Sequence, residues 1–273
     1  MKSIVPACLR NLVFSFCIVL GLMLPWCVRA DLMTSFQGLT LDANLHLDVP
    51  NPGVGKITLD TINQSLLFKG LGADLWDNRN GLPYAWTDIP DVGVGGTWRA
   101  ETEVKYNVSS HGSGRIAGLT TYAGPDGAGG ASARQEFTFG LDQWDDPYGI
   151  WVQGLGDNSP GGSSNLKKGL ITDVADLRMD VTVGVGNYNT YDFFFKQPSD
   201  SDWTSLGTIH YTSTDSRVAL FFKGGEMDVS FNYFNVTTVP EPSSMVMFAI
   251  FGVILLNRRP NGARRRQVSY LRI

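Results

Sequence analysis

The sequence predicts an all-β protein built around one antiparallel β-sandwich of the jelly-roll kind. Three observations carry this prediction. Apolar residues alternate with polar ones along most of the chain between residues 31 and 238, which is the period of a half-buried strand. Clusters of Gly, Pro, Asn and Asp separate the alternating runs. The only stretch of possible helical character is 172–177. We therefore expect roughly ten to fourteen strands in two packed sheets.

The expected strands follow one another through the whole central region. The alternating runs are residues 45–49, 98–106, 137–141, 177–185, 191–195, 218–222 and 227–233. Turn signals lie between them, at residues 51–53, 124–127, 159–162 and 223–225. At about 200 residues, this region is long enough to bury an adequate core without cross-links.

The N-terminus has the pattern of a secretory signal peptide. Lys2 and Arg10 precede an apolar stretch at 12–26, and short residues lead up to Ala30. Signal peptidases recognise this order of charge, apolar segment and small residues. We predict a signal peptide at 1–30, cleaved after Ala30, and an exported domain at 31–238.

Cysteine and charge exclude several kinds of site in the exported domain. The three cysteines, Cys8, Cys17 and Cys27, all lie in the predicted signal peptide. The mature domain therefore has no disulfide, thiolate metal site or cysteine nucleophile. Between residues 31 and 240 there are 13 Lys and Arg against 25 Asp and Glu, a net charge of −12. Such an acidic domain is not expected to bind nucleic acid, which needs a basic surface.

The C-terminus combines a rigid linker, a short apolar segment and arginines. Pro240 and Pro242 flank Glu241 and force an extended backbone. An apolar segment at 244–257 follows, and it is short for a bilayer crossing of about 20 residues. The basic residues of 260–273 favour a cytoplasmic location for that end. We therefore predict a short transmembrane segment at 244–257 and a basic cytoplasmic tail at 260–273.

Residues 239–259 resemble the PEP-CTERM sorting signal of bacteria. The order Pro240, Glu241, Pro242, apolar segment and arginines carries the resemblance. It implies processing near Pro-Glu-Pro by an exosortase, a membrane protease, and an association with exopolysaccharide. The chain departs from the family by continuing through 260–273. The expected partners are signal peptidase, an exosortase, the bacterial membrane and extracellular polysaccharide. The expected location is the membrane before processing, and the cell surface or extracellular matrix afterwards.

The last third of the exported domain resembles concanavalin A-like, laminin G-like domains. The resemblance rests on strand order and on Trp203 within a hairpin, in residues 191–195, 202–207, 218–222 and 229–236. Family members often have Asp-Gly before the tryptophan, whereas Ser-Asp-Ser-Asp stands here at 199–202. The resemblance implies a glycan-binding, adhesive or glycosidase function, among which fold alone does not choose.

Two aromatic loops provide the candidate carbohydrate-binding residues. A flat ring covers the apolar face of a sugar while nearby amides and carboxylates bond its hydroxyls. The candidates are Trp76, Asp77, Asn78, Tyr84, Trp86, Trp144, Asp145 and Tyr148. Some of these rings could equally plug the ends of the core.

The sequence offers weaker support for catalysis and for metal binding. The histidines His46, His111 and His210 are widely separated, without a nucleophile-elbow motif. The carboxylates of Glu101, Glu103 and Glu136 could serve a glycosidase, although alternating acids are typical of a solvated strand face. The carboxylates of Asp142, Asp145 and Asp146 could bind a calcium ion between strands, and no other cofactor is expected.

These observations favour a non-enzymatic, surface-targeted, glycan-binding β-sandwich. A glycoside hydrolase or polysaccharide lyase of jelly-roll fold is one alternative. A structural matrix or adhesion protein without a small ligand is the other.

Overall fold

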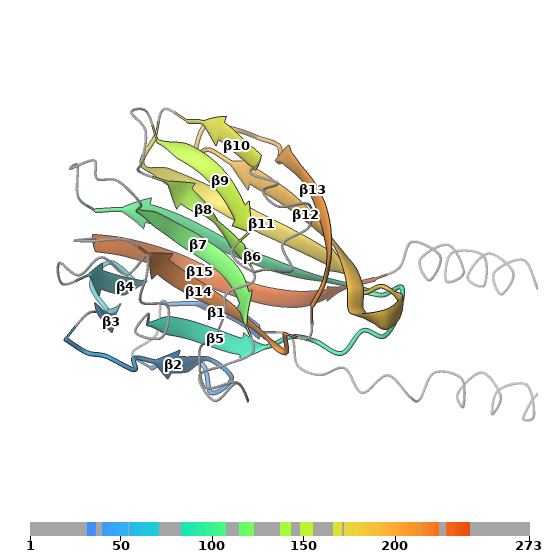
Figure 1. Ribbon diagram of the computed structural model, residues 1–273. Coiled ribbons are helices and arrows are strands. Elements are labelled where there is room, and N and C mark those ends of the chain that lie inside the picture. Colours follow the sequence, from blue (N-terminus) through green and yellow to red (C-terminus); the bar gives the residue numbers. More distant parts are fainter. Residues whose placement is uncertain are drawn as a thin grey trace, which may run out of the picture.

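Two antiparallel sheets packed face to face make up the domain, as Figure 1 shows for this computed structural model. The structure describes residues 32–36, 40–53, 55–70, 83–107, 115–122, 137–142, 148–154, 166–170, 172–213, 215–223 and 228–240. The predicted signal peptide with Ala30, the sorting residues Glu241 and Pro242, and the segment 244–257 lie outside these residues. Pro240 is the last residue described.

Within the described ranges, none of the helices is long and apolar enough to cross a membrane.

The larger sheet has eight strands. Seven of them follow the order β13-β12-β11-β6-β15-β4-β3, and β1 pairs with the same edge of β15 as β4 does. The strands are β1 (Leu32–Ser35), β3 (Gly55–Asp60), β4 (Ser65–Gly70), β6 (Thr97–Tyr106), β11 (Val174–Thr182), β12 (Tyr188–Lys196), β13 (Thr204–Thr212) and β15 (Asp228–Val239). A short 3-10 turn, η3 (Val185–Asn187), joins β11 to β12.

The smaller sheet has seven strands in the order β10-β9-β8-β7-β14-β5-β2. The strands are β2 (His46–Asp48), β5 (Tyr84–Asp88), β7 (Ile116–Tyr122), β8 (Phe137–Asp142), β9 (Gly149–Gly154), β10 (Leu166–Gly169) and β14 (Arg217–Lys223). The prediction of a single antiparallel β-sandwich is confirmed. The possible helix at 172–177 is wrong, because β11 begins at Val174 and alternates buried with half-buried residues.

The core lies between the sheets and follows the predicted alternation. In β11, Leu177, Met179 and Val181 point inward, and in β12 Tyr191, Phe193 and Phe195 do the same. Phe193 packs edge-on against Phe139 of the opposite sheet, with ring centroids 4.9 Å apart. Trp98 is also buried in this core. The alternation thus places every second residue of the large sheet on its outer face.

The central part of the outer face of the smaller sheet is buried as well. Phe222 packs on Phe68 in the core, so alternation turns its neighbours Phe221 and Lys223 outward, yet both are fully buried. Tyr84, which pairs with Phe221, is buried on the same face. In the described residues, only the large sheet therefore presents an open outer face across its central strands.

Candidate functional site

A row of polar side chains crosses the outer face of the large sheet at right angles to the strands. The strand registers pair Lys196 with Asp176, and Asp176 with Glu103. On the other side of β15, the register pairs Phe231 with Leu66, so the next residues, Asn232 and Ser65, lie beside each other. Ser65 in turn pairs with Asp60 of β3. The members of this polar row are Asp60, Ser65, Asn232, Tyr233, Glu103, Asp176 and Lys196. The row spans six neighbouring strands, from β3 to β12.

A β-bulge in β15 lies at the centre of the polar row. Phe231 pairs with Val104 and Phe234 with Thr102, so Asn232 and Tyr233 together oppose the single residue Glu103. The bulge turns both side chains to the outer face. Asn232 donates a hydrogen bond from Nδ2 to Glu103, and the Tyr233 hydroxyl donates to Asp176 Oδ1 at 2.9 Å. Bulges commonly re-aim side chains in this way beside functional sites.

An open groove of about 480 Å³ lies at one end of the polar row. Its volume falls within the roughly 300–1,000 Å³ that is usual for ligand sites. Its lining is Asp60, Asn63, Ser65, Leu67, Lys105, Asn107, Asp228, Ser230 and Asn232. The amide groups are held by neighbours: Asn63 Nδ2 donates to Asp60 at 2.7 Å, and Asn107 Nδ2 donates to Asp228 at 2.9 Å. The groove is therefore a set of pre-oriented amides, hydroxyls and carboxylates.

The Trp203 indole marks the other end of the polar row. It lies half-buried in the turn between β12 and β13. Lys196 Nζ lies 5.3 Å from the centroid of the Trp203 ring, and the Arg178 guanidinium carbon lies 5.8 Å from it. Lys196 also reaches Asp176, with Nζ 3.5 Å from Oδ2. The row thus runs from a polar groove to an aromatic ring.

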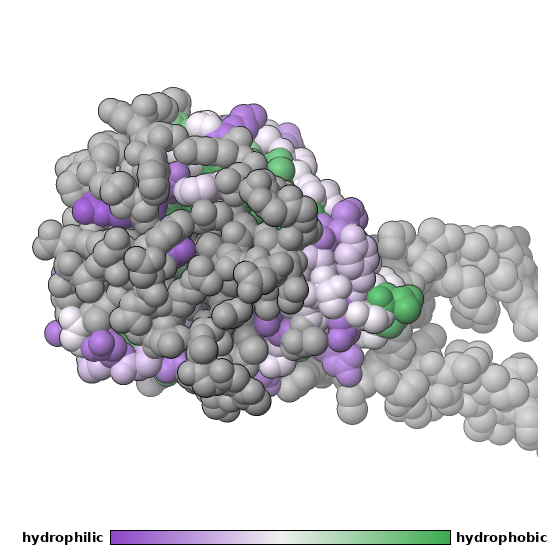
Figure 2. Space-filling model, in the orientation of Figure 1, coloured by the Kyte–Doolittle hydropathy of each residue, from purple (hydrophilic) through white to green (hydrophobic). Residues whose placement is uncertain are grey.

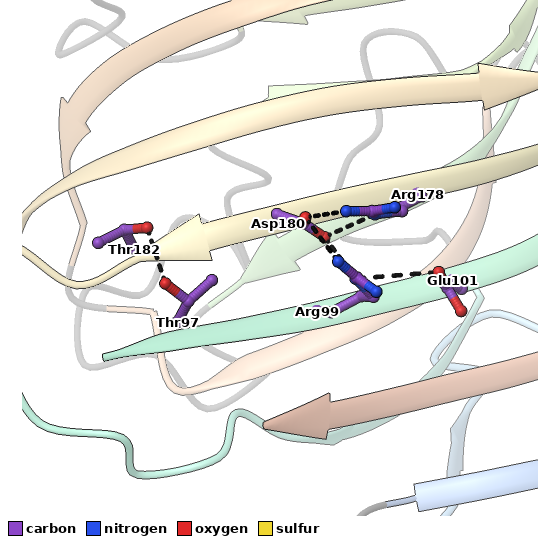
Figure 3. Close-up of polar contacts among 6 residues, drawn as sticks. All are labelled: Thr97, Arg99, Glu101, Arg178, Asp180 and Thr182. Carbon is purple, nitrogen blue, oxygen red and sulfur yellow. Dashed lines mark hydrogen bonds and ion pairs between the residues drawn. The ribbon is translucent and has the colours of Figure 1, made fainter. Parts of the chain in front are cut away.

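An ion-pair network lies next to the polar row and braces β6 against β11 (Figure 3). Arg99 donates two hydrogen bonds to the Asp180 carboxylate, at 2.7 and 2.9 Å. Arg178 donates to the same carboxylate from Nε at 2.9 Å, and its guanidinium stacks on Phe194 at 4.7 Å. Burial would raise the pKa of Asp180, but the hydrogen bonds from Arg178 and Arg99 outweigh it and lower that pKa. Asp180 therefore stays ionised.

The carboxyl groups beside this network titrate differently. Burial raises the pKa of Glu101 against the opposing charges of Arg99 and Arg178. Burial, and then the nearby charge of Asp176, raises the pKa of Glu103. Burial, followed by the same Asp176 charge, raises the pKa of the Tyr233 hydroxyl, so this group stays a proton donor. The polar row therefore holds a carboxyl, Glu103, that accepts a proton more readily than an ordinary glutamate does.

The predicted residue Trp86 lies on the outer face of the smaller sheet. Its ring stacks on His46 from β2, with centroids 4.4 Å apart, and the Arg217 guanidinium of β14 lies 4.1 Å from the ring centroid. Because β2 and β14 flank β5 on opposite sides, the two contacts cover both faces of the indole. The indole of Trp86 is therefore contacted by protein side chains from both neighbouring strands, and its role in sugar binding stays a prediction.

A smaller pocket lies beside His46, where β1 and β15 approach β2 and β5. It holds about 130 Å³, less than the usual ligand site. It is lined by Leu32, Asn44, His46, Thr87, Asp88, Pro90 and Val236. We regard the groove on the large sheet as the stronger candidate.

The structure separates the other predicted residues. Tyr84 is buried on the outer face of the smaller sheet, and Tyr148 is half-buried against Tyr106, with ring centroids 5.8 Å apart. Five candidates lie outside the described residues, namely Trp76, Asp77, Asn78, Trp144 and Asp145. The carbohydrate-binding role of the eight residues remains a prediction.

The other chemical candidates are placed as follows. His46 and His210 lie on different sheets, while His111 and Glu136 lie outside the described residues. For calcium, Asp142 is buried in β8, and Asp145 and Asp146 lie outside the described residues. Among the residues that can be described, no group of three or more His, Cys, Asp or Glu side chains could hold a metal ion.

The polar row was missed by sequence reasoning, apart from Glu103. A usable signal was the alternation of charged residues in two strands, at 99, 101 and 103 and again at 176, 178 and 180. Two such strands in one sheet are expected to pair their charges. The sequence did not, however, reveal that Asp60, Ser65 and Asn232 continue the same row.

Comparison with known proteins identifies the fold. No family model matches this chain, and no curated protein matches it. Among solved structures, it is similar to a bifunctional GH43-CE protein of Bacteroides eggerthii, with a TM-score of 0.56 and 14% identity. That match covers 80% of this chain and 27% of the other.

Two further structures match with lower TM-scores. A GH43 protein, BlXynB, of Bacillus licheniformis has a TM-score of 0.45 and 16% identity, over 78% of this chain and 40% of the other. A lectin from Bauhinia forficata in complex with GalNAc has a TM-score of 0.44 and 9% identity, over 77% and 99%. The chain thus spans less than half of either GH43 protein. What it shares with the Bacteroides protein is a β-sandwich fold.

Proposed function

We propose that this protein is an exported bacterial surface protein that binds an extended polysaccharide chain, without cleaving it, along the polar row of the large sheet. The observation that carries the proposal is the β15 bulge, which sets Asn232 and Tyr233 against Glu103 and Asp176 on an open face. The bulge joins the groove at one end to Trp203 at the other.

The chemistry of the polar row suits sugar hydroxyls. Carboxylates accept hydrogen bonds, amides both donate and accept them, and hydroxyls do both. Trp203 supplies an apolar ring for stacking. With neighbouring strands about 4.8 Å apart, five strand spacings extend about 24 Å. That length suits several units of a linear polymer rather than one monosaccharide.

The location follows from the two ends of the sequence. The signal peptide at 1–30 would direct export, and the segment 244–257 would hold the protein in the bacterial membrane. Signal peptidase and an exosortase-type protease would process the chain after Ala30 and near Pro240, Glu241 and Pro242. The mature domain would then remain at the cell surface or in the matrix beside the polysaccharide.

The test is retention of the full-length protein, in detergent, on a panel of immobilised bacterial and algal polysaccharides, with and without EDTA. Asn232→Ala and Trp203→Ala should each weaken retention about tenfold, the loss expected for one important hydrogen bond or ring contact. Asn235→Ala is the matched control. Asn235 lies on the same strand but outside the polar row, because it pairs with Glu101 rather than opposing Glu103. Its substitution should leave retention within about twofold.

The outcomes separate the alternatives. Equal losses in all three variants, with unfolding, would contradict a specific site. A blank panel for a protein that still fractionates with the matrix would favour a structural matrix protein. Loss of retention in EDTA alone would indicate calcium.

A hydrolase remains the second candidate because Glu103 and Asp176 lie in different environments. They are directly opposed across β6 and β11. Asp176 accepts a hydrogen bond from Tyr233 and contacts Lys196, whereas the pKa of Glu103 is raised. Two opposed carboxyl groups, one of them with a raised pKa, are what glycoside hydrolysis uses. If the protein is a hydrolase or lyase, the wild type releases reducing ends or unsaturated products from the polysaccharide, and Glu103→Gln releases none while it is still retained. Products that persist in Glu103→Gln, or a wild type that releases no product, would reject catalysis.

A further inference from the structure

The sequence Val-Gly-Val-Gly occurs twice, at 92–95 and at 183–186. The two copies form neighbouring turns, one before β6 and one between β11 and β12. The backbone joins them: Gly95 N–H donates to the Val183 carbonyl at 2.8 Å, and Val183 N–H donates to the Gly96 carbonyl at 3.0 Å. One end of the sandwich therefore carries the same motif twice, side by side.

The second valine of each copy projects from its turn. Gly93 and Gly95 both adopt positive φ around Val94. Gly186 also adopts positive φ directly after Val185. Val94 is 67% exposed and Val185 is 83% exposed. Glycine makes such turns possible, but it does not require the residue between to be apolar.

Tyr188 extends the exposed apolar surface. It lies directly after the second turn, is 57% exposed, and stacks on His210 with ring centroids 6.1 Å apart. We call Val94, Val185 and Tyr188 the apolar tip. Single exposed apolar residues need no explanation, whereas a group of them on neighbouring turns marks a contact surface.

The apolar tip lies at the end of the sandwich where the chain leaves it. Val239 pairs with Thr97, whose hydroxyl is 2.9 Å from that of Thr182. Leu32 pairs with Val236, so the described chain also starts near this end. Figure 1 shows β11, β12 and β15 reaching this end together, and Figure 2 shows hydrophobic surface exposed there in green.

Chain length limits how far this end can lie from a membrane. The apolar segment predicted at 244–257 begins five residues after Val239. Five residues span at most about 18 Å when fully extended. If the segment enters the bilayer, the last residues of β15, and the tip beside them, must lie within that distance of it.

We propose that, before the chain is processed near Pro240, Glu241 and Pro242, the apolar tip rests in the interface of the membrane that the C-terminal segment enters. The proposal depends on the membrane segment of the proposed function but not on glycan binding. Two valines supply apolar contact, and a tyrosine suits the boundary between lipid and water. β15 then points toward the membrane, and the polar row, which crosses the strands, runs parallel to the membrane surface.

The height of the polar row follows from the same geometry. Asn232 precedes Val239 by seven residues of β15, and a strand rises about 3.3 Å per residue, which gives about 23 Å. As long as the membrane segment is attached, a polymer bound along the polar row would therefore lie parallel to the membrane, clear of the lipid headgroups.

The test uses residues 31–273, the full chain without its signal peptide. This part of the chain contains no cysteine, so an introduced cysteine is labelled alone. Val94→Cys and Val185→Cys are each labelled with an environment-sensitive fluorophore, and the protein is reconstituted into phosphatidylcholine vesicles. Ile62→Cys is the matched control, because Ile62 is 89% exposed in the turn between β3 and β4, away from the tip. Nitroxide-labelled lipid should quench the labels at 94 and 185 several-fold more than the label at 62, with a blue shift at the two tip positions only.

Equal quenching at the three positions would overturn the proposal. Energy transfer between labels at 94 that rises with protein density, without lipid quenching, would overturn it in favour of an interface between two copies. If the protein does not float with the vesicles, the membrane segment does not insert and the proposal fails with it. Polysaccharide retention by the same sample is scored separately, so failure of the tip contact is distinguishable from failure of glycan binding.

Discussion

The outer faces of the two sheets differ, although both belong to strands that alternate in the same way. On the large sheet, the outward residues Arg99, Glu101, Arg178 and Asp180 are half-buried and form ion pairs within and between β6 and β11. On the small sheet, outward residues such as Thr120, Phe221 and Lys223 are fully buried. The difference shows that alternation identifies the two faces of a strand without telling which of them remains open to a ligand.

The largest effect is expected where a residue pointing inward is compared with its neighbour pointing outward. Phe193→Ala removes a ring packed between the sheets and should lower the free energy of unfolding by about 3–5 kcal/mol. Phe194→Ala, on the same strand, removes a half-buried ring stacked under Arg178 and should cost about 1 kcal/mol. Urea unfolding followed by circular dichroism measures both. Similar losses would show that the outer face of β12 is packed like the core.

A second comparison concerns the glycines of the small sheet. A Cβ at Gly118 would lie 2.2 Å from the Phe139 carbonyl oxygen, whereas a Cβ at Gly169 would meet no atom within 4 Å. Gly118→Ala should therefore destabilise the protein by about 1–3 kcal/mol, as overpacking does. Gly169→Ala should change stability by less than about 0.5 kcal/mol, measured in the same way. A neutral Gly118→Ala would mean that β7 and β8 separate easily at this point.

Much of the fold could be predicted from the sequence because alternation is a local property. The run at 177–185 predicted the inward set Leu177, Met179 and Val181, which the structure buries. Strand partners are not local: β15 lies between β6 and β4, and more than 100 residues separate it from either. The polar row depends on these pairings, and on a bulge that shifts the register by one residue. For that reason the sequence could identify Glu103 as a candidate site residue but could not predict the polar row around it.

Non-local strand pairing also explains why the sequence did not show the ring contacts of Trp86. A tryptophan beside an aromatic, amide-rich loop favours sugar stacking when only its sequence neighbours are known. The residues that cover its ring, His46 and Arg217, lie 40 and 131 positions away in the chain. A sequence identifies ring types but not the faces left open after the sheet forms.

The ion-pair network of the large sheet provides the third prediction. Asp180→Asn keeps the shape of the side chain but removes the charge that joins Arg99 and Arg178. The expected loss of stability at pH 7 is about 1–2 kcal/mol, since hydrogen bonds to charged groups are involved but the site is partly exposed. The folded protein lowers the pKa of Asp180, so its contribution is present at neutral pH and is lost as the pH falls below about 4. The difference in unfolding free energy between the two proteins should therefore shrink as the pH falls from about 4 through the lowered pKa of Asp180. A difference that stays constant over that range would assign the loss to packing.

The smallest expected change in stability is a gain rather than a loss, and it concerns Glu103. The folded state raises the pKa of Glu103, by burial first and then by Asp176, so the folded protein holds a proton there more tightly than the unfolded chain does. Ionised Glu103 therefore weakens the fold at neutral pH, and this penalty disappears as the pH falls through the raised pKa toward the ordinary value of about 4.3. Glu103→Gln should stabilise the protein at pH 7 by less than about 0.5 kcal/mol, because solvent screens a half-exposed charge, and should have no effect near pH 4.

Glu101→Gln is the matched control: Arg99 and Arg178 oppose the rise in the pKa of Glu101, so the gain in stability should be smaller. A destabilised Glu103→Gln at pH 7 would show that the charge of Glu103 supports the fold, and that the carboxyl is not held ready for a ligand.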